Sequence, residues 1–409
     1  MNKIIMTLLC VFIAATVTGQ SIDTLIQMAK SHNPGLRALN LEYKAALKIV
    51  EQKGDYPDPK VNLGLGVLPV ETRLGAQRMK LGITQAIPWK GLLEARQDLA
   101  AAQADIKASM GSIKTIDIAY AIRIAYSTVI FLEDRITLID QRLEVLDILE
   151  ELAKSALRSG KGKLSNVLFI ERNREMLEEE KVILEKQKEQ PTIMINRWTG
   201  RPLDTVINLI DSTYISPDFI SGGIDQYVDF SENNHPSLKV LESKITASAR
   251  SIELTRLEEK PKIGVGLDYA LVDDRNDVTI ANNGRDILMP MASISIPLNK
   301  GRFEAKRQEE IIKQDAIKAT ADDMREMYKA EIFSAQSNIE LAELSIQKEN
   351  KLKVITRETL KLMRTEYASE GTRFEELLRL EMELIDFEME IINANYQKSL
   401  AQSILFKYQ

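Results

Sequence analysis

Two stretches of alternating residues, each enclosed by long helical segments, limit most strongly what this chain can fold into. In the first, apolar residues alternate with small or polar ones at residues 61–68 and again at 78–87, on either side of a polar tip from Pro69 to Gln77. A period of two is the signal of a strand with two different faces. Strands of roughly ten residues with glycine on one face are typical of hairpins that cross a membrane. The first stretch is therefore predicted to be a membrane β-hairpin.

The same pattern returns in the second half of the chain. Alternating residues recur at 263–271 and 287–296, and the motif Asn33-Pro34-Gly35-Leu36 has a counterpart in His235-Pro236-Ser237-Leu238. The offset between paired residues stays between 202 and 210 along the chain. A fixed offset of this kind indicates an internal duplication. We expect the two copies to form one interleaved architecture.

The duplication divides the chain into a first structural repeat, an equatorial connector and a second structural repeat, at residues 21–202, 203–234 and 235–409. Each repeat contains one very long helix, predicted from Gly91 to Leu157 and from Arg302 to Ala368. At a rise of 1.5 Å per residue, each of these helices is about 100 Å long. A turn after each long helix leads into a returning helix, and the first returning helix is expected to end at Pro191. The expected fold class is mixed α and β, mostly α.

The first twenty residues have the pattern of an export signal. Lys3 precedes an apolar run from Ile4 to Val17, and small residues follow up to Gly19. This pattern predicts a signal peptide at residues 1–20 that is cleaved near Gly19 or Gln20. The alternative is a membrane anchor, but the apolar run is short for a bilayer span. Cys10 lies inside the run and is expected to be removed with it.

Composition excludes several classes of function. The 409 residues carry a net charge of −6 and no basic cluster, so nucleic acid is not expected as a partner. Two histidines and one cysteine leave little for metal or thiol chemistry. No nucleophile and base stand in a recognisable arrangement. We therefore expect neither an enzyme nor a cofactor or metal site.

Four predicted strands imply an assembly of several copies. Open sheet edges cannot lie in hydrocarbon, because their unpaired amide and carbonyl groups would each cost several kcal/mol. Four strands are also too few to close around a lumen. Two copies would supply eight strands and three copies would supply twelve.

The chain resembles the TolC family of outer-membrane efflux channels. The resemblance rests on the signal peptide, the duplicated plan of helix, hairpin, long helix, turn and helix, and the element Asn196-Arg197-Trp198-Thr199-Gly200-Arg201-Pro202. It implies a homotrimer, in which a twelve-stranded β-barrel in the outer membrane continues into a periplasmic α-helical barrel. The chain departs from many such channels in that it has no cysteine placed for acylation.

The resemblance also implies partners and a location. A periplasmic adaptor (a membrane fusion protein) and an inner-membrane pump of the RND type would complete an efflux complex at the outer membrane of a Gram-negative-type bacterium. The segment Leu68 to Arg73, with Gln77-Arg78-Met79 and Pro88-Trp89, resembles channels of heavy-metal cation efflux systems. Drug efflux and type I protein secretion are alternatives within the family. A trimeric coiled-coil stalk or adhesin is the alternative from another class.

Two helix–turn–helix tips, Ser159 to Leu168 and Ser369 to Leu378, resemble the periplasmic ends of the family. The resemblance implies that the tips meet the adaptor, and the residues expected at this contact are Ser159, Gly160, Leu164, Ser369, Gly371 and Phe374. It also implies a pore constriction there, for which the candidates are Glu375, Glu376 and Arg379. A ring of carboxylates at a constriction favours cations. The alternative for the two glutamates is an ordinary helix start, where acidic residues are favoured.

Overall fold

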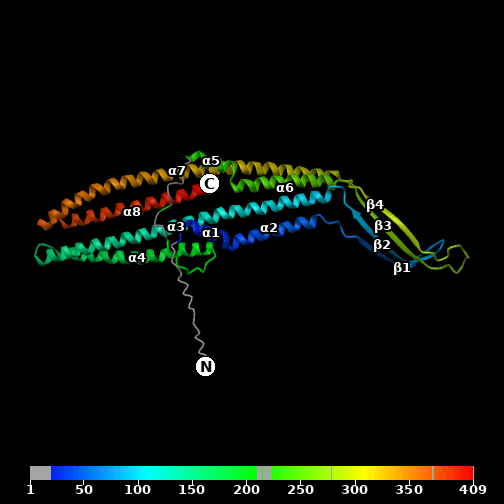
Figure 1. Cartoon of the computed structure of the whole chain (residues 1–409), viewed down its shortest axis with the longest axis horizontal. Coiled ribbons are helices and arrows are strands. Elements are labelled where there is room, and N and C mark those ends of the chain that lie inside the picture. Colours follow the sequence, from blue (N-terminus) through cyan, green and yellow to red (C-terminus); the bar gives the residue numbers. More distant parts are fainter. Residues whose placement is uncertain (1–19, 210–213, 215–222, 278, 371–372, 409) are drawn as a thin grey trace, which may run out of the picture. The chain divides into compact units, whose positions relative to one another are not determined.

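The computed structural model describes residues 20–209, 214, 223–277, 279–370 and 373–408. The predicted signal peptide therefore lies outside the described residues, apart from Gln20. The described chain is mostly helical with four strands (Figure 1), and its elements are α1 (Ile22–His32), α2 (Pro34–Lys53), β1 (Lys60–Thr72), β2 (Gly75–Ile87), α3 (Leu92–Arg158), α4 (Leu164–Thr199), α5 (Gly223–Asn233), α6 (Pro236–Glu258), β3 (Lys262–Val272), β4 (Ile287–Ser295), α7 (Lys300–Glu370), α8 (Phe374–Leu405) and the short 3₁₀ helix η2 (Phe406–Tyr408).

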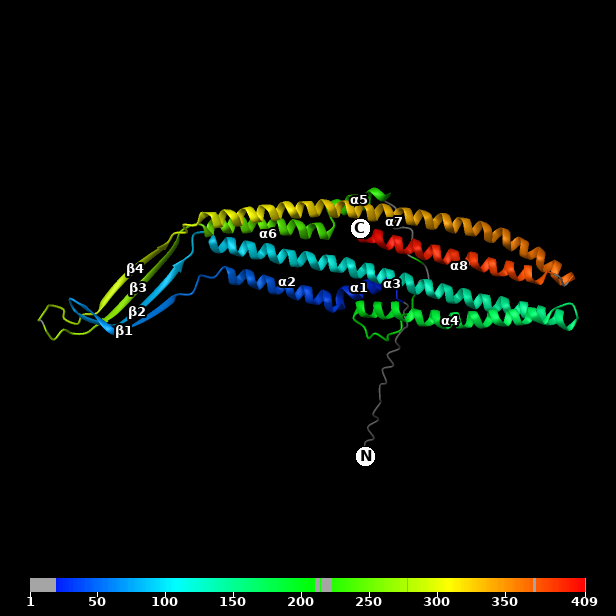
Figure 2. The same ribbon diagram turned by 180° about the vertical axis from the view of Figure 1, so that it is seen from behind.

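The order of elements repeats. The series α2, β1, β2, α3, α4 is followed by the series α6, β3, β4, α7, α8 (Figure 2). Both series begin with a helix whose first residue is a proline, and the side chain of the residue before that proline caps the helix. The Asn33 side chain accepts a hydrogen bond from the Gly35 amide at 2.9 Å, and the His235 ring accepts one from the Ser237 amide at 3.3 Å. The paired motifs in the sequence therefore have the same structural role.

The described residues form two compact units that do not coincide with the two repeats. We call them the strand unit, Arg37–Ile113 with Glu232–Met327, and the tip unit, Met1–Leu36 with Lys114–Ser231 and Tyr328–Gln409. Each unit takes segments from both repeats, because the long helices α3 and α7 contribute to both units. This agrees with the expected interleaving.

The strand unit contains one antiparallel sheet in the order β1, β2, β3, β4 (Figure 1). The register places Leu63, Leu81, Tyr269 and Leu288 side by side across the four strands. Directly opposite residues share a face, and their neighbours two positions along each strand share it too. The resulting apolar sheet face comprises Val61, Leu63, Leu65, Leu81, Ile83, Val265, Leu267, Tyr269, Leu288 and Ile294. Its central row is exposed by 39% to 62%.

The opposite side of the sheet, which we call the glycine-rich face, is polar. Its central row is Asn62, Gly82, Asp268 and Met289, and Gly64, Gly264 and Gly266 lie beside it. The Asp268 side chain is buried over Gly82, where an added Cβ would lie 2.4 Å from its Oδ1. Lys80 Nζ lies 2.6 Å from Asp268 Oδ2. Glycine at position 82 therefore makes room for a charged pair on this face.

The first hairpin differs from its prediction. The strands were expected to stop at Leu68 and to resume at Arg78, but β1 continues to Thr72 and β2 begins at Gly75. Gly75 has a φ of +134°, and the Thr72 hydroxyl donates a hydrogen bond to the Gly75 carbonyl at 2.6 Å. The register of β1 against β2 shifts between Leu65 and Val70, which is typical of a β-bulge, and the pairing resumes at Val70.

The expected end of the first returning helix at Pro191 is wrong. Helix α4 continues to Thr199, with Pro191 buried inside it. Four of its buried residues are spaced by seven, namely Ile170, Leu177, Leu184 and Pro191. A seven-residue seam packs continuously against neighbouring helices, and this packing outweighs the hydrogen bond that proline removes.

The element Asn196 to Pro202 ends α4 against the junction of α1 and α2 within the tip unit. Asn196 is buried and its amide donates hydrogen bonds to the carbonyls of Leu203 and Thr205, at 3.1 and 2.7 Å. The Trp198 carbonyl accepts a hydrogen bond from Asn33 Nδ2 at 2.9 Å. Gly200 caps the helix with a φ of +72°. This element is therefore structural.

One described helix, α3, contains a stretch of 18 residues that is long and apolar enough to cross a membrane by length and composition. Its mean hydropathy is 1.4, and 56% of the stretch is buried inside the protein. Ile118, Ile122 and Val129 of α3 belong to a core that also includes Leu25 of α1. The stretch is therefore interpreted as a core helix of the tip unit.

Candidate functional site

The predicted functional residues lie where the tip unit turns twice, between α3 and α4 and between α7 and α8. The first turn is built around the backbone carbonyl of Ala156. It accepts hydrogen bonds from the amides of Lys161 and Gly162 and from the Ser159 hydroxyl, each at 2.9 Å. Gly160 adopts a φ of +73°, which disfavours other residues. Ser159 and Gly160 therefore determine the shape of the turn.

The second turn depends on Arg373, which sequence analysis did not single out. Arg373 has a φ of +66° and precedes α8. Its guanidinium donates hydrogen bonds to Glu366 of α7, at 3.3 Å, and to Glu376 of α8. The hydrogen bond from Arg373 lowers the pKa of Glu376 below its ordinary value of 4.5. One arginine therefore links both helices of this hairpin.

Two other predicted tip residues can be placed only in part. Gly371 lies outside the described residues. Ser369 belongs to the last turn of α7.

Acidification is expected to loosen the α7–α8 turn. A carboxyl group whose pKa is lower in the folded state contributes stability that is present above its unfolded pKa and is lost as the pH falls through the folded value. Protection of the amide hydrogens at the end of α7 and the start of α8, measured relative to the exchange rate of an unstructured chain at the same pH, should therefore fall as the pH falls from about 5 to about 3. In Arg373→Ala this protection should be low at both pH values. Equal, pH-independent protection in both proteins would contradict this role of Arg373.

Phe374, expected to contact an adaptor, is instead buried under the turn. Its ring packs against Tyr367 of α7, with ring centroids 5.4 Å apart. Phe374, Leu377 and Leu378 share one face of α8 because they are three and four residues apart. The core around them includes Leu149, Ala153, Ile170, Leu177, Leu360 and Met363 from the other three helices. Phe374 therefore holds the two hairpin tips together from the inside.

A buried carboxylate continues the same face of α8. Glu381 is only 2% exposed, and Arg364 Nε of α7 lies 2.7 Å from its Oε1. The sequence does indicate this buried acid, because Glu381 lies at helical spacing between the apolar residues Leu377, Leu378 and Ile385.

The three candidates for the constriction have different surroundings. Glu375 and Arg379 are exposed and line a groove of about 480 Å³ between α4 and α8, together with Ser165, Asn166, Phe169, Phe374, Leu378 and Met382. Glu375 also lines a second groove of about 420 Å³ with Lys161, Lys163, Arg373 and Glu376. Among the described residues, no cation forms an ion pair with Glu375. Glu376 is bound to Arg373, so Glu375 is the carboxylate that can interact with solvent ions.

The first turn of α4 begins an exposed apolar stripe. Leu164, Leu168, Phe169 and Met176 are exposed by 44% to 62%. Residues four apart are neighbours on one face of a helix, so Leu164 and Leu168 lie side by side. Leu164 is therefore a surface residue of the tip, as an adaptor contact requires.

No family model matches this sequence, and no curated protein matches it. Solved structures do match. The outer-membrane channel OprN is 15% identical, with 95% of this chain and 89% of that chain covered and a TM-score of 0.74. CusC, studied for conformational changes that accompany folding and transmembrane channel formation, is 15% identical, with 95% and 92% covered and a TM-score of 0.74. The open state of the MtrE outer-membrane channel of Neisseria gonorrhoeae is 15% identical, with 95% and 88% covered and a TM-score of 0.73.

At these identities the likeness shows the fold. The expected fold class, mostly helical with a few strands, is confirmed, and the stated resemblance to outer-membrane channels is confirmed at the level of the fold. The matching structures are described as channels.

Proposed function

We propose that this chain, which has the fold of solved outer-membrane channels, is the outer-membrane channel of a tripartite efflux complex. Three copies form a twelve-stranded β-barrel in the outer membrane and a helical barrel in the periplasm. The assembly is a passive exit duct and carries out no reaction. The observation that carries the proposal is the sheet, which has an exposed apolar face on one side and a glycine-rich, charged face on the other.

The two faces suit two different surroundings. An apolar face of ten side chains that no described residue covers is favourable in lipid, at about 25 cal/mol per Å² removed from water. The glycine-rich face holds Lys80 and Asp268 and suits a water-filled lumen. Both edge strands, β1 and β4, lack a further neighbour in the described sheet. Pairing of β1 with β4 of the next copy removes these edges.

Engineered disulfides test the closure of the barrel. Asn62→Cys on β1 and Ser293→Cys or Ser295→Cys on β4 lie on the same face of opposite edge strands. The only native cysteine is Cys10, so the mature protein gives a cysteine-free background. Oxidation in isolated membranes should link copies into a covalent trimer. Thr84→Cys with Ser293→Cys, which moves the first cysteine from the edge strand β1 to the same face of the interior strand β2, is the matched control. Copies that stay unlinked in every edge pair would contradict the closed barrel.

The tips of the helices are proposed to dock a periplasmic adaptor, which connects the channel to an inner-membrane pump of the RND type. The exposed Leu164 stripe and the groove beside Glu375 offer the apolar surface for this contact. Export follows from the predicted signal peptide at residues 1–20. The proposed location is the outer membrane of a Gram-negative-type bacterium.

Heavy-metal cations are the proposed substrate, on the basis of the sequence segments around Pro69 and Trp89. The equal TM-scores of CusC and OprN do not favour one substrate. Drug efflux and protein secretion remain the alternatives for the same duct. The stalk or adhesin is not favoured, because the chain aligns over 95% of its length with channels.

Glu375 is proposed to contribute to the pore constriction, with Arg379 beside it, whereas Glu376 stabilises the turn. Glu375→Gln should lower the ratio of cation to anion permeability about twofold or more, because it removes one unpaired carboxylate from each copy. Reversal potentials of the purified protein in planar bilayers measure this ratio. Glu171→Gln, which removes an exposed carboxylate of α4, is the control. An unchanged ratio in Glu375→Gln would assign the constriction to other residues.

A further inference from the structure

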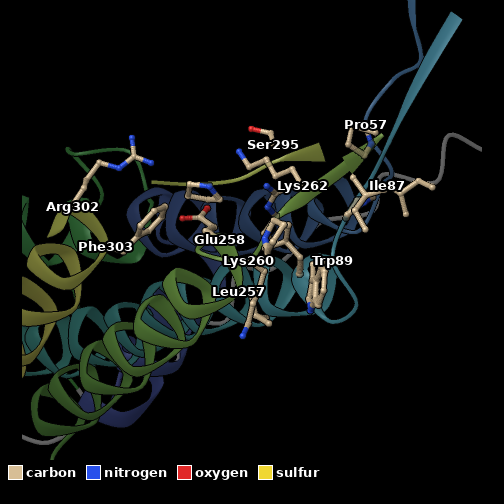
Figure 3. A pocket seen from close by; sticks show the side chains of 17 residues that line it. Pro57, Ile87, Trp89, Leu257, Glu258, Lys260, Lys262, Ser295, Arg302 and Phe303 are labelled. Atoms are coloured by element: carbon tan, nitrogen blue, oxygen red, sulfur yellow. The ribbon is translucent and has the colours of Figure 1, made fainter. Parts of the chain in front are cut away.

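A pocket of about 530 Å³ lies in the strand unit where the strands meet the helices. It is formed by the ends of the strands, the end of α6 and the first turns of α3 and α7 (Figure 3). Ile87 and Ile263 pair with each other on the apolar sheet face, and Lys262 and Ser295 pair on the glycine-rich face. The pocket therefore lies at the strand ends and is lined by residues from both faces of the sheet.

The charges around the pocket are unbalanced. Four cations line it, namely Arg96, Lys260, Lys262 and Arg302. The one acid in its wall, Glu258, is paired with Lys306 at 3.1 Å. In the part of the chain that the structure describes, no carboxylate forms an ion pair with any of the four cations. Elsewhere in the strand unit cations are paired, as Arg250 is with Asp98 at 3.3 Å and Arg307 with Glu259 at 2.8 Å.

The rest of the wall is apolar and rigid. Trp89 and Ile87 lie on one side in Figure 3 and Phe303 lies on the other, with Lys260 and Lys262 between them. Four prolines complete the wall, at positions 57, 88, 261 and 297. Proline fixes the backbone and offers no N–H group, so the side-chain hydrogen-bond donors for a bound anion are the four cations, the Trp89 indole and the Ser295 hydroxyl.

We propose that this pocket binds the anionic phosphate headgroup of a membrane phospholipid. The inference rests on the proposed function, since it requires the sheet to lie in a bilayer. The pocket then lies where the apolar sheet face ends, which is the level of the headgroups. Tryptophan favours this level, and basic side chains attract anionic lipids there. Lys260, which lies just before β3, contacts the phosphate, and Ile87, Trp89 and Ile263 of the lipid-facing side contact the start of the acyl chains.

Native mass spectrometry of the full protein, released from nanodiscs that contain equal amounts of phosphatidylglycerol and phosphatidylcholine, tests the site. The wild type should retain phosphatidylglycerol in preference to phosphatidylcholine. Lys260→Ala should retain about fivefold less phosphatidylglycerol. Lys90→Ala removes the same charge from a lysine next to the pocket that does not line it, and it should retain as much as the wild type.

Two results would overturn the proposal. Equal retention of both lipids by the wild type would show, without any variant, that the pocket does not select the headgroup. Loss of the retained lipid in millimolar inorganic phosphate, with phosphate bound in its place, shows a site for the free anion. The disulfide test of the barrel separates this inference from the proposed function. A closed trimer that retains lipid without preference overturns the lipid site alone, whereas the absence of a closed trimer overturns the channel as well.

Discussion

Replacing Leu81 by arginine is expected to abolish accumulation of the protein in the outer-membrane fraction. Leu81 lies at the middle of β2, in the central row of the apolar sheet face between Leu63 and Tyr269. An arginine on the lipid face near the bilayer midplane costs about 2–4 kcal/mol in each copy. In a trimer this sums to about 6–12 kcal/mol, which is comparable with the whole stability of a typical domain. Membrane fractionation with detection of the trimer on gels measures the effect.

Thr84→Arg is the matched control for this experiment. Thr84 lies in the same strand, but it pairs with Lys60 and Gly266 on the glycine-rich face. An arginine there would face water in the proposed lumen, so the trimer should form in wild-type amounts. If Leu81→Arg inserts normally while Thr84→Arg does not, the two faces of the sheet are assigned the wrong way round. Normal insertion of both variants would argue against a lipid-facing sheet.

Replacing Arg364 by leucine is expected to destabilise the α7–α8 hairpin by about 3 kcal/mol, because it leaves the carboxylate of Glu381 buried without its charged partner. Glu381 is 2% exposed, and its Oε1 accepts hydrogen bonds from Arg364. The melting temperature of the purified protein and hydrogen exchange along α8 measure the loss. The melting temperature should fall, and exchange should become faster along α8 while the strands of the sheet stay protected.

The double variant Arg364→Leu/Glu381→Leu separates a buried charge from lost packing. Replacing both partners by apolar side chains removes the unpaired carboxylate, so stability should return to near the wild-type value. If the double variant is as unstable as Arg364→Leu, the packing of the arginine stem is what matters. If neither variant changes the stability, the pair has no structural role.

Much of the fold could be predicted from the sequence, because the elements repeat and their periods are strong. The alternation after Pro261 predicts β3, and the interruption at Asn33-Pro34 predicts the boundary between α1 and α2. Local signals failed where tertiary packing decides. Proline at position 191 predicts a helix end, but the buried seam from Ile170 to Ile195 carries α4 through it.

The candidate site was predictable in position and not in detail. Glycine marks both turns of the tip unit in the sequence, with Ser159 and Gly160 at the first turn, and acidic residues including Glu375 mark the second. Arg373 decides that Glu376, and not Glu375, is paired. No sequence pattern predicts the left-handed backbone conformation of Arg373. Phe374 was expected outside, but its spacing from Leu377 and Leu378 places it in the core. A full reading of the apolar period along α8 would have found both Phe374 and Glu381.

The central claim is that the four strands separate lipid from a water-filled lumen, and cysteine accessibility tests it most directly. Ser293 and Ile294 are neighbours in β4 on opposite faces of the sheet. Single-channel currents of Ser293→Cys and Ile294→Cys are recorded in planar bilayers before and after addition of a charged, water-soluble methanethiosulfonate reagent. The account predicts stepwise currents from both variants and a reduced current after modification of Ser293→Cys alone. Modification of Ile294→Cys alone, or no current from inserted protein, would contradict it.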